Sequence, residues 1–229
     1  MKMAKEITVA LAGNPNSGKT TVFNNLTGAR QHVGNWPGVT VEKKEGGCSY
    51  QGYDIKVVDL PGVYSLTAYS IDEVIARNFI IDEKPDVVVD IVDVSNLERN
   101  LYLTVQLLEM GAKLIVALNM MDQADSRNHQ IDVKQLSKLL GAPVVPMMAN
   151  RNRGTEELLK EIVNLAESRV LVKELRVEYG HEVEEEIEKL EKLISWSALA
   201  QKYSPRWLAI KLLEEDEEIV KKFEGVEVG

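Results

Sequence analysis

Eight consecutive residues near the N-terminus match the phosphate-binding pattern G-x-x-x-x-G-K-[ST]. They are Gly13, Asn14, Pro15, Asn16, Ser17, Gly18, Lys19 and Thr20. The two glycines let the backbone curl so that successive N–H groups point inward and form an anion nest where a helix begins. Lys19 would place a positive charge at the β- and γ-phosphates, and the Thr20 hydroxyl would ligate Mg²⁺. The pattern predicts a binding site for a nucleoside triphosphate.

A second motif, D-x-x-G, follows the apolar run 55–58. It consists of Asp59, Leu60, Pro61 and Gly62. A carboxylate at a strand end that faces the phosphate loop can hold Mg²⁺ through water, and the Gly62 N–H can reach a γ-phosphate. The motif is weak alone, but its place after a predicted strand and beyond the phosphate loop makes it informative.

The choice of base is predicted by a third motif, Asn119-Met120-Met121-Asp122, which follows the apolar run 114–118. An Asp carboxylate can accept two hydrogen bonds from guanine, whose ring N–H and exocyclic amine form a donor pair that adenine lacks. Hydrogen bonds to charged groups contribute about 1.5–3 kcal/mol each, so Asp122 can select guanine. Met120 stands where most nucleotide-binding proteins of this kind carry lysine, and its apolar stem can still lie across the base.

Apolar runs that alternate with helical patterns must position these motifs. Strands are predicted at 7–12, near 41–50, and at 55–58, 87–92, 114–118 and 144–147; helices are predicted at 71–81, 99–110, 133–140 and 155–168. This alternation predicts an α/β fold with a mostly parallel six-stranded sheet and helices on both faces. Ligands of such sheets bind at the carboxyl ends of the strands, where the three motifs lie.

The pattern changes near residue 169, where the predicted strands stop. Val183, Ile187, Leu190 and Ile194 recur at helical spacing with Glu and Lys on the other face, which predicts an amphipathic helix. Ser204-Pro205 is typical of an N-cap with a first-turn proline and predicts a helix through 206–213. We therefore predict a nucleotide-binding domain over 1–168 and a small all-α domain over 169–229.

The composition narrows the class of protein. The chain has 229 residues, enough for one ordinary domain plus a small second one, and a formal net charge of −9. Phosphate affinity comes mostly from Lys and Arg, so nucleic acid is not an expected partner. Cys48 is the single cysteine, which rules out an intrachain disulfide. There is no secretory leader and no apolar run of the roughly 18–20 residues that a membrane helix needs, so the chain is expected to be soluble.

Taken in order, the three motifs resemble those of the translation-factor-type GTPases, the wider family that includes Ras, and the resemblance covers 6–168. In more detail, the segments 34–42, 59–66 and 96–103 closely resemble the ferrous iron transport protein B family. The resemblance implies a Ras-like P-loop G domain over 1–168 and that family's helical spacer domain, of the GDI-like kind, over 169–229. Because the family's proteins continue into a membrane domain, it also implies a cytosolic part of a ferrous iron transporter, at the cytoplasmic face of the inner membrane, with that membrane domain as its partner.

The resemblance also implies roles for single residues. Thr40 matches the family's switch I threonine, which ligates Mg²⁺ and senses the γ-phosphate. The Asn16 side chain, with the backbone carbonyls of Gly34 and Trp36, would bind a K⁺ ion beside the β- and γ-phosphates, where other GTPases place an arginine finger. The expected catalytic set is Asn16, Lys19, Thr40 and Gly62. Further contacts with GTP or GDP are expected from Thr21, Gly38, Val39 and a guanine loop of Met148, Ala149 and Asn150, with the Ala149 N–H at the guanine oxygen.

Val63 follows Gly62, where Ras-like proteins carry the glutamine that orients water. Valine cannot orient water by hydrogen bonding, and G domains without assistance hydrolyse GTP at roughly 10⁻⁴ to 10⁻² per second. We expect a rate at the low end without K⁺ and a clear rise with it. The segments 34–41 and 62–69 are expected to be loops that respond to the nucleotide.

Two other functions stay open at this point. A free-standing GTPase of the RNA or ribosome assembly type would share the phosphate chemistry, but it would need a basic appended surface, whereas 182–188 is rich in glutamate. A module that binds GTP without hydrolysing it is also consistent with Val63. The sequence leaves assembly into a homo-oligomer open.

Overall fold

The computed structural model describes residues 5–126, 130–168 and 177–224. The chain forms two compact units, Met1–Leu108 with Ala112–Lys173, and Glu109–Gly111 with Glu174–Gly229. We call them the sheet unit and the helical unit and describe each by itself. The domain boundary expected after residue 168 borders the segment 169–176, which lies outside the described residues.

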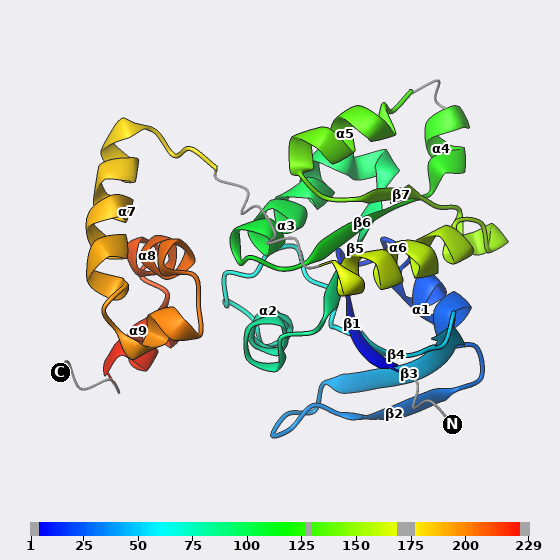
Figure 1. Cartoon of the computed structure of the whole chain (residues 1–229), viewed down its shortest axis with the longest axis horizontal. Coiled ribbons are helices and arrows are strands. Elements are labelled where there is room, and N and C mark those ends of the chain that lie inside the picture. The colour runs from blue at the N-terminus through cyan, green and yellow to red at the C-terminus, as the bar shows by residue number, and fades with distance from the viewer. Residues whose placement is uncertain (1–4, 127–129, 169–176, 225–229) are drawn as a thin grey trace. The chain divides into compact units, whose positions relative to one another are not determined.

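The sheet unit is built on a seven-stranded sheet with the order β2-β3-β4-β1-β5-β6-β7 (Figure 1). Its strands are β1 (Lys5–Gly13), β2 (Gln31–Asn35), β3 (Glu42–Tyr50), β4 (Tyr53–Asp59), β5 (Val87–Asp93), β6 (Leu114–Asn119) and β7 (Val144–Pro146). The pairs β4–β1, β1–β5, β5–β6 and β6–β7 are parallel, and β2–β3 and β3–β4 are antiparallel. The predicted α/β class with a mostly parallel sheet is confirmed.

The prediction of six strands was wrong, because β2 was missed. All five residues of β2 are exposed, so the strand carries none of the apolar alternation by which a sequence reveals a strand. It forms at the sheet edge through antiparallel pairing with β3, in which Gly34 lies opposite Lys43. The segment 34–41 is therefore not a loop throughout, since Gly34 and Asn35 belong to β2.

Helices cover both faces of the sheet. They are α1 (Lys19–Thr27), α2 (Ile71–Asn78), α3 (Leu97–Glu109), α4 (Met121–Ser126), α5 (Val133–Leu140) and α6 (Thr155–Glu167), and a π-helical turn, Phe79–Glu83, continues α2. The core under α1 and α6 takes Ile7, Val9 and Leu11 from β1, while Ala10 and Ala12 are buried on the other face. Burial of both faces explains why the central strands are almost continuously apolar.

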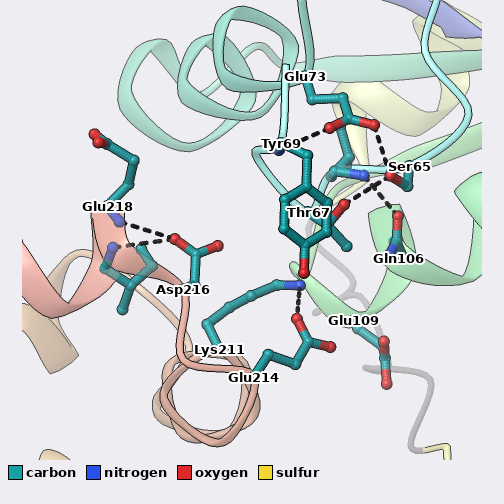
Figure 2. Close-up of polar contacts among 12 residues, drawn as sticks. Ser65, Thr67, Tyr69, Glu73, Gln106, Glu109, Lys211, Glu214, Asp216 and Glu218 are labelled. Atoms are coloured by element: carbon teal, nitrogen blue, oxygen red, sulfur yellow. Dashed lines mark hydrogen bonds and ion pairs between the residues drawn. The ribbon is translucent and has the colours of Figure 1, made fainter. Parts of the chain in front are cut away.

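The helical unit contains α7 (His181–Ile194), a 3₁₀ turn (Ala198–Gln201), α8 (Pro205–Leu213) and α9 (Glu217–Glu224). α7 packs on α8, and α8 contacts α9. The Ser204 hydroxyl accepts from the Trp207 N–H at the start of α8, as the sequence predicts. At the start of α9, Asp216 is buried and accepts from the N–H groups of Glu218 and Ile219 (Figure 2).

An ion pair between Arg206 and Glu184, whose side chains are 9% and 20% exposed, joins α8 to α7. The Arg206 guanidinium donates two hydrogen bonds, of 2.9 and 2.8 Å, to the carboxylate of Glu184 on α7. This contact raises the pKa of Arg206, with burial acting in the opposite direction. Across the described part of the chain, no helix is both long and apolar enough to cross a membrane.

Candidate functional site

The phosphate loop joins the end of β1 to the start of α1. Gly18 is the N-cap of α1, with a φ of 91°, and a Cβ at this position would lie 2.3 Å from the Asn119 Nδ2. A Cβ on Gly13 would lie 2.8 Å from the Ile91 carbonyl oxygen. Only glycine fits at these two points, because both have a positive φ, 153° at Gly13 and 91° at Gly18, and both lie against neighbouring chain.

Within this loop, buried polar atoms lack partners among the described residues. They are both amide atoms of Asn14 and the Ser17 hydroxyl. Buried polar groups without partners cost free energy, so such a group in a folded protein calls for a ligand, a water molecule or a functional role. Pro15, Asn16, Thr20 and Thr21 are exposed, and Asn16 has a φ of 66°. The loop thus offers a polar, partly open surface of the kind that phosphates require.

Asp59 and the D-x-x-G segment lie directly beside the phosphate loop. Asp59 is the last residue of β4, and its carboxylate forms an ion pair with the Lys19 ammonium; the two side chains are 7% and 11% exposed. The Val63 N–H donates to the Gly13 carbonyl at 3.2 Å, and a Cβ on Gly62 would lie 3.4 Å from Pro15. The structure therefore brings Lys19, Asp59 and Gly62 together, as the motifs predict.

Asn119 joins the third motif to the phosphate loop. This side chain is 3% exposed at the end of β6, and its Nδ2 donates to the Ser17 carbonyl at 3.0 Å. Its Oδ1 accepts from the Ala149 N–H, also at 3.0 Å. Met120 follows with a φ of 63°, and its methyl group lies 3.8 Å from the position of a Cβ on Gly18. One amide thus connects the phosphate loop, β6 and the guanine loop.

The expected guanine loop, Met148, Ala149 and Asn150, overlaps a 3₁₀ turn, Ala149–Arg151, whose residues contact several elements. The Asn25 Nδ2 on α1 donates to the Ala149 carbonyl at 2.8 Å. Met148 and Arg153 form an isolated antiparallel bridge, and Asn150 is exposed. The Ala149 N–H, expected at the guanine oxygen, donates to Asn119 in this structure.

Asp122, the residue expected to select the base, lies in the first turn of α4. Its carboxylate is 3.6 Å from the guanidinium of Arg151, and its side chain is 25% exposed. Sequence reasoning singled out neither Arg151 nor Asn25, because these contacts join residues far apart in the chain and neither residue belongs to a motif.

The segment 34–41, expected to act as switch I, begins in β2 and joins it to β3, and its Trp36 packs against the π-helical turn that continues α2. Trp36 is buried, and its ring packs edge-on against Phe79, with centroids 5.5 Å apart. The Trp36 carbonyl accepts from the Val39 N–H at 3.3 Å, Gly38 has a φ of 77°, and Thr40 is exposed. Among the described contacts, none joins Gly34, Trp36 or Thr40 to the phosphate loop. The K⁺ ligands expected at Gly34 and Trp36 and the Mg²⁺ ligand expected at Thr40 therefore stay predictions.

A hydrogen-bonded network holds the segment that follows Gly62 (Figure 2). The Ser65 hydroxyl shares a hydrogen bond with Thr67 and donates to the Glu73 carboxylate at 2.8 Å. Glu73 also accepts from the N–H groups of Tyr69 and Ser70 and completes a capping box at the start of α2. The Leu66 N–H donates to the Gln106 side chain on α3. This segment is thus anchored at both ends.

The residues present fit a Mg²⁺ ion that phosphates help to hold. In the described ranges, no cluster of three or more His, Cys, Asp or Glu residues could hold a metal ion. The candidate ligands are the Thr20 hydroxyl and the Asp59 carboxylate at the phosphate loop. The Thr40 hydroxyl, expected as a third ligand, lies in the segment 34–41, which no described contact joins to the loop. Mg²⁺ prefers oxygen ligands and usually binds through few carboxylates plus substrate phosphates, which is the ligand set offered here.

The fold and these contacts define a class of protein. A phosphate loop after β1, a D-x-x-G segment after β4 and an N-x-x-D segment after β6 lie at one edge of a mostly parallel sheet. That arrangement is the G domain of the P-loop GTPases, here followed by a helical unit.

Comparisons with known proteins identify the family. The family described as "Ferrous iron transport protein B" matches residues 7–162, and the one described as "FeoB cytosolic helical domain" matches 179–228. The chain belongs to the ferrous iron transport protein B family. It is similar to the Fe(2+) transporter FeoB of Escherichia coli (strain K12), with 48% identity over 219 residues, covering 93% of this chain and 27% of the relative. The chain thus spans about a quarter of the length of such relatives.

Solved structures agree with the fold. The cytosolic domain of the T. maritima FeoB iron transporter in GDP form I has a TM-score of 0.89 and 44% identity, covering 95% of this chain and 84% of that one. The GMPPNP form of the same domain has a TM-score of 0.88 and 43% identity, covering 94% and 84%. Because these matches cover 95% and 94% of this chain, the likeness extends to the helical unit as well as the sheet unit.

Proposed function

We propose that this chain binds GTP and GDP, hydrolyses GTP slowly, and regulates or drives ferrous iron uptake as the cytosolic part of a longer membrane transporter. The observation that carries the proposal is that Lys19, Asp59 and Asn119 meet at the phosphate loop. Asp122 follows Asn119 in the chain and lies beside Arg151 of the expected guanine loop's 3₁₀ turn. The forms named for the T. maritima domain, GDP and GMPPNP, support guanine nucleotide as the ligand.

Charged side chains of the chain itself would bind the phosphates and help to hold Mg²⁺. Lys19 would exchange its contact with Asp59 for the β- and γ-phosphates, and Asp59 would then be free to accept from metal-bound water. When bound, Mg²⁺ supplies positive charge that offsets the charge of the phosphate oxygens. Thr20, Thr40 and Asp59 would hold it, with Gly38 and Val39 positioning Thr40 in switch I.

Hydrolysis requires help that Val63 cannot give. This side chain is 4% exposed and carries no polar group, so it orients no water. We propose that Asn16 with the carbonyls of Gly34 and Trp36 holds K⁺, which would supply the positive charge that other GTPases take from an arginine. Both carbonyls would first have to leave their present surroundings on β2 and in the turn before β3, so the ion and the triphosphate would order switch I together.

Single-turnover GTP hydrolysis in KCl and in NaCl, at equal ionic strength and with Mg²⁺ present, tests this proposal. K⁺ is expected to raise the rate about tenfold or more. Asn16→Ala should lose the difference between the salts, while Asn164→Ala, an exposed residue of α6, should keep it. Equal rates in the two salts would show that K⁺ does not assist hydrolysis. No turnover in either salt would favour a module that binds GTP without hydrolysing it.

The transport role rests on the family. In the full-length transporter, we propose that nucleotide-dependent changes in 34–41 and 62–69 pass through the helical unit to the membrane domain of the same polypeptide, and that the assembly works at the cytoplasmic face of the inner membrane. Asp122→Asn should abolish Fe²⁺ uptake by cells that depend on this transporter. Uptake that continues at the wild-type rate would show that GTP does not control transport.

A further inference from the structure

We propose that Arg151 sets the affinity of the guanine site by competing with the base for the Asp122 carboxylate. The proposal rests on the guanine-binding role of Asp122 given above. It adds a residue that belongs to none of the three motifs. Its consequence is that a positive charge of the chain itself returns to Asp122 whenever guanine leaves, which favours release of the nucleotide.

The charges and distances support competition. The Arg151 guanidinium lies 3.6 Å from one Asp122 oxygen, and the two side chains are 59% and 25% exposed. Guanine would use both oxygens of this carboxylate, one for its ring N–H and one for its exocyclic amine. Arg151 lies near one of these two oxygens, so guanine can use both only if the guanidinium moves away or shares that oxygen.

The backbone around Arg151 is held independently of its side chain. The Arg151 N–H donates to the Met148 carbonyl at 2.9 Å, and the Asn152 N–H donates to the Ala149 carbonyl at 3.0 Å. The same Ala149 carbonyl also accepts from the Asn25 side chain. The turn therefore presents Arg151 at Asp122 without needing the ion pair, and truncating this side chain should leave the turn in place.

A second contact at the same end of the site acts in the same direction. The Ala149 N–H, the donor expected at the guanine oxygen, already donates to the Asn119 Oδ1 at 3.0 Å in a buried position. A donor and an acceptor needed by the base thus both have partners within the protein. Guanine must exchange these contacts for its own, so only the difference between them contributes to affinity.

The expected size of the effect follows from the exposure of the pair. Partly exposed ion pairs contribute little, and we expect Arg151→Ala to bind GDP about two- to fivefold more tightly, which at 1.4 kcal/mol per tenfold is about 0.4–1 kcal/mol. The gain should appear mainly as slower dissociation. It should shrink in 1 M salt, where screening acts over about 3 Å.

The experiment titrates the whole chain with GDP by calorimetry and measures dissociation by stopped flow, for wild type, Arg151→Ala and the matched control Arg153→Ala. Arg153 is an exposed arginine of the same loop and carries the same charge. Removing it should leave GDP affinity unchanged or slightly weaker, because the nucleotide is an anion. Weaker or unchanged GDP binding by Arg151→Ala would overturn the proposal.

A double-mutant cycle separates this inference from the function on which it rests. Asp122→Asn should change the preferred ligand from GDP to xanthosine diphosphate. In that background, Arg151→Ala should not tighten the binding of xanthosine diphosphate, because the carboxylate with which Arg151 pairs is gone. If Asp122→Asn fails to exchange the bases, the guanine role of Asp122 is wrong. If the specificity changes but Arg151→Ala has the same effect on affinity in both backgrounds, only the proposed competition between Arg151 and the base is wrong.

Discussion

Replacing Asn119 with alanine should destabilise the sheet unit and detach two loops of the nucleotide site. The Asn119 amide is 3% exposed, donates to the Ser17 carbonyl and accepts from the Ala149 N–H, each at 3.0 Å. Truncation leaves that carbonyl and that N–H without their partner. A buried group left unsatisfied costs about 1–3 kcal/mol, so the two together predict a loss of about 2–6 kcal/mol in the free energy of unfolding.

Amide hydrogen exchange measured by mass spectrometry checks this value within the sheet unit alone. The slowest amides of β5 and β6, whose residues are almost entirely buried, report the unfolding of that unit without interference from the helical unit. Asn164→Ala is the matched control, because Asn164 is exposed on α6 and surface changes usually stay within about 0.5 kcal/mol. A loss below about 1 kcal/mol for Asn119→Ala would refute the reasoning, since it would mean that the loops do not depend on this amide.

Two further predictions concern groups outside the nucleotide contacts. Burial raises the pKa of Asp90 to about 7, against a smaller opposing effect of its hydrogen bond from Thr104. The folded chain therefore holds a proton that the unfolded chain releases, so stability should fall as pH rises from about 4 to about 7 and then level off. Asp90→Asn should lose this slope in urea unfolding at a series of pH values; an unchanged slope would assign the titration to another group. Glu73→Ala removes the capping box with Ser70 and should weaken the start of α2 by about 1 kcal/mol, seen as faster amide exchange there. The exposed neighbour Asp72 is the control, and equal effects of Asp72→Ala and Glu73→Ala would show that the box is not what holds α2.

The sequence predicted structure correctly where the residues that determine an element lie within that element or directly beside it. The central strands could be predicted because both of their faces are buried, and α5 was predicted at its observed bounds, Val133–Leu140. The N-cap of α8 at Ser204 was likewise readable, because a cap and its helix are adjacent in the chain. The three motifs were recognisable because each places its chemistry within a few residues at the end of a strand.

The sequence did not predict contacts between segments that are far apart in the chain. β2 is exposed throughout, and only its pairing with β3 makes it a strand. The Asn25–Ala149 hydrogen bond joins residues 124 apart, and no local pattern predicts it. The six-stranded prediction failed for this reason, since an edge strand that buries nothing leaves no periodicity in the sequence.

By itself, the sequence determined the class of fold and the phosphate loop and predicted guanine as the base, because backbone freedom at Gly13 and Gly18 and the charges of Lys19 and Asp122 are properties of those residues. Only the tertiary structure decided which partners those groups have. It placed Asp59 on Lys19, Ala149 on Asn119 and Arg151 beside Asp122. Each of these contacts depends on strands and loops meeting at one edge of the sheet, and that meeting is set by packing of the whole unit.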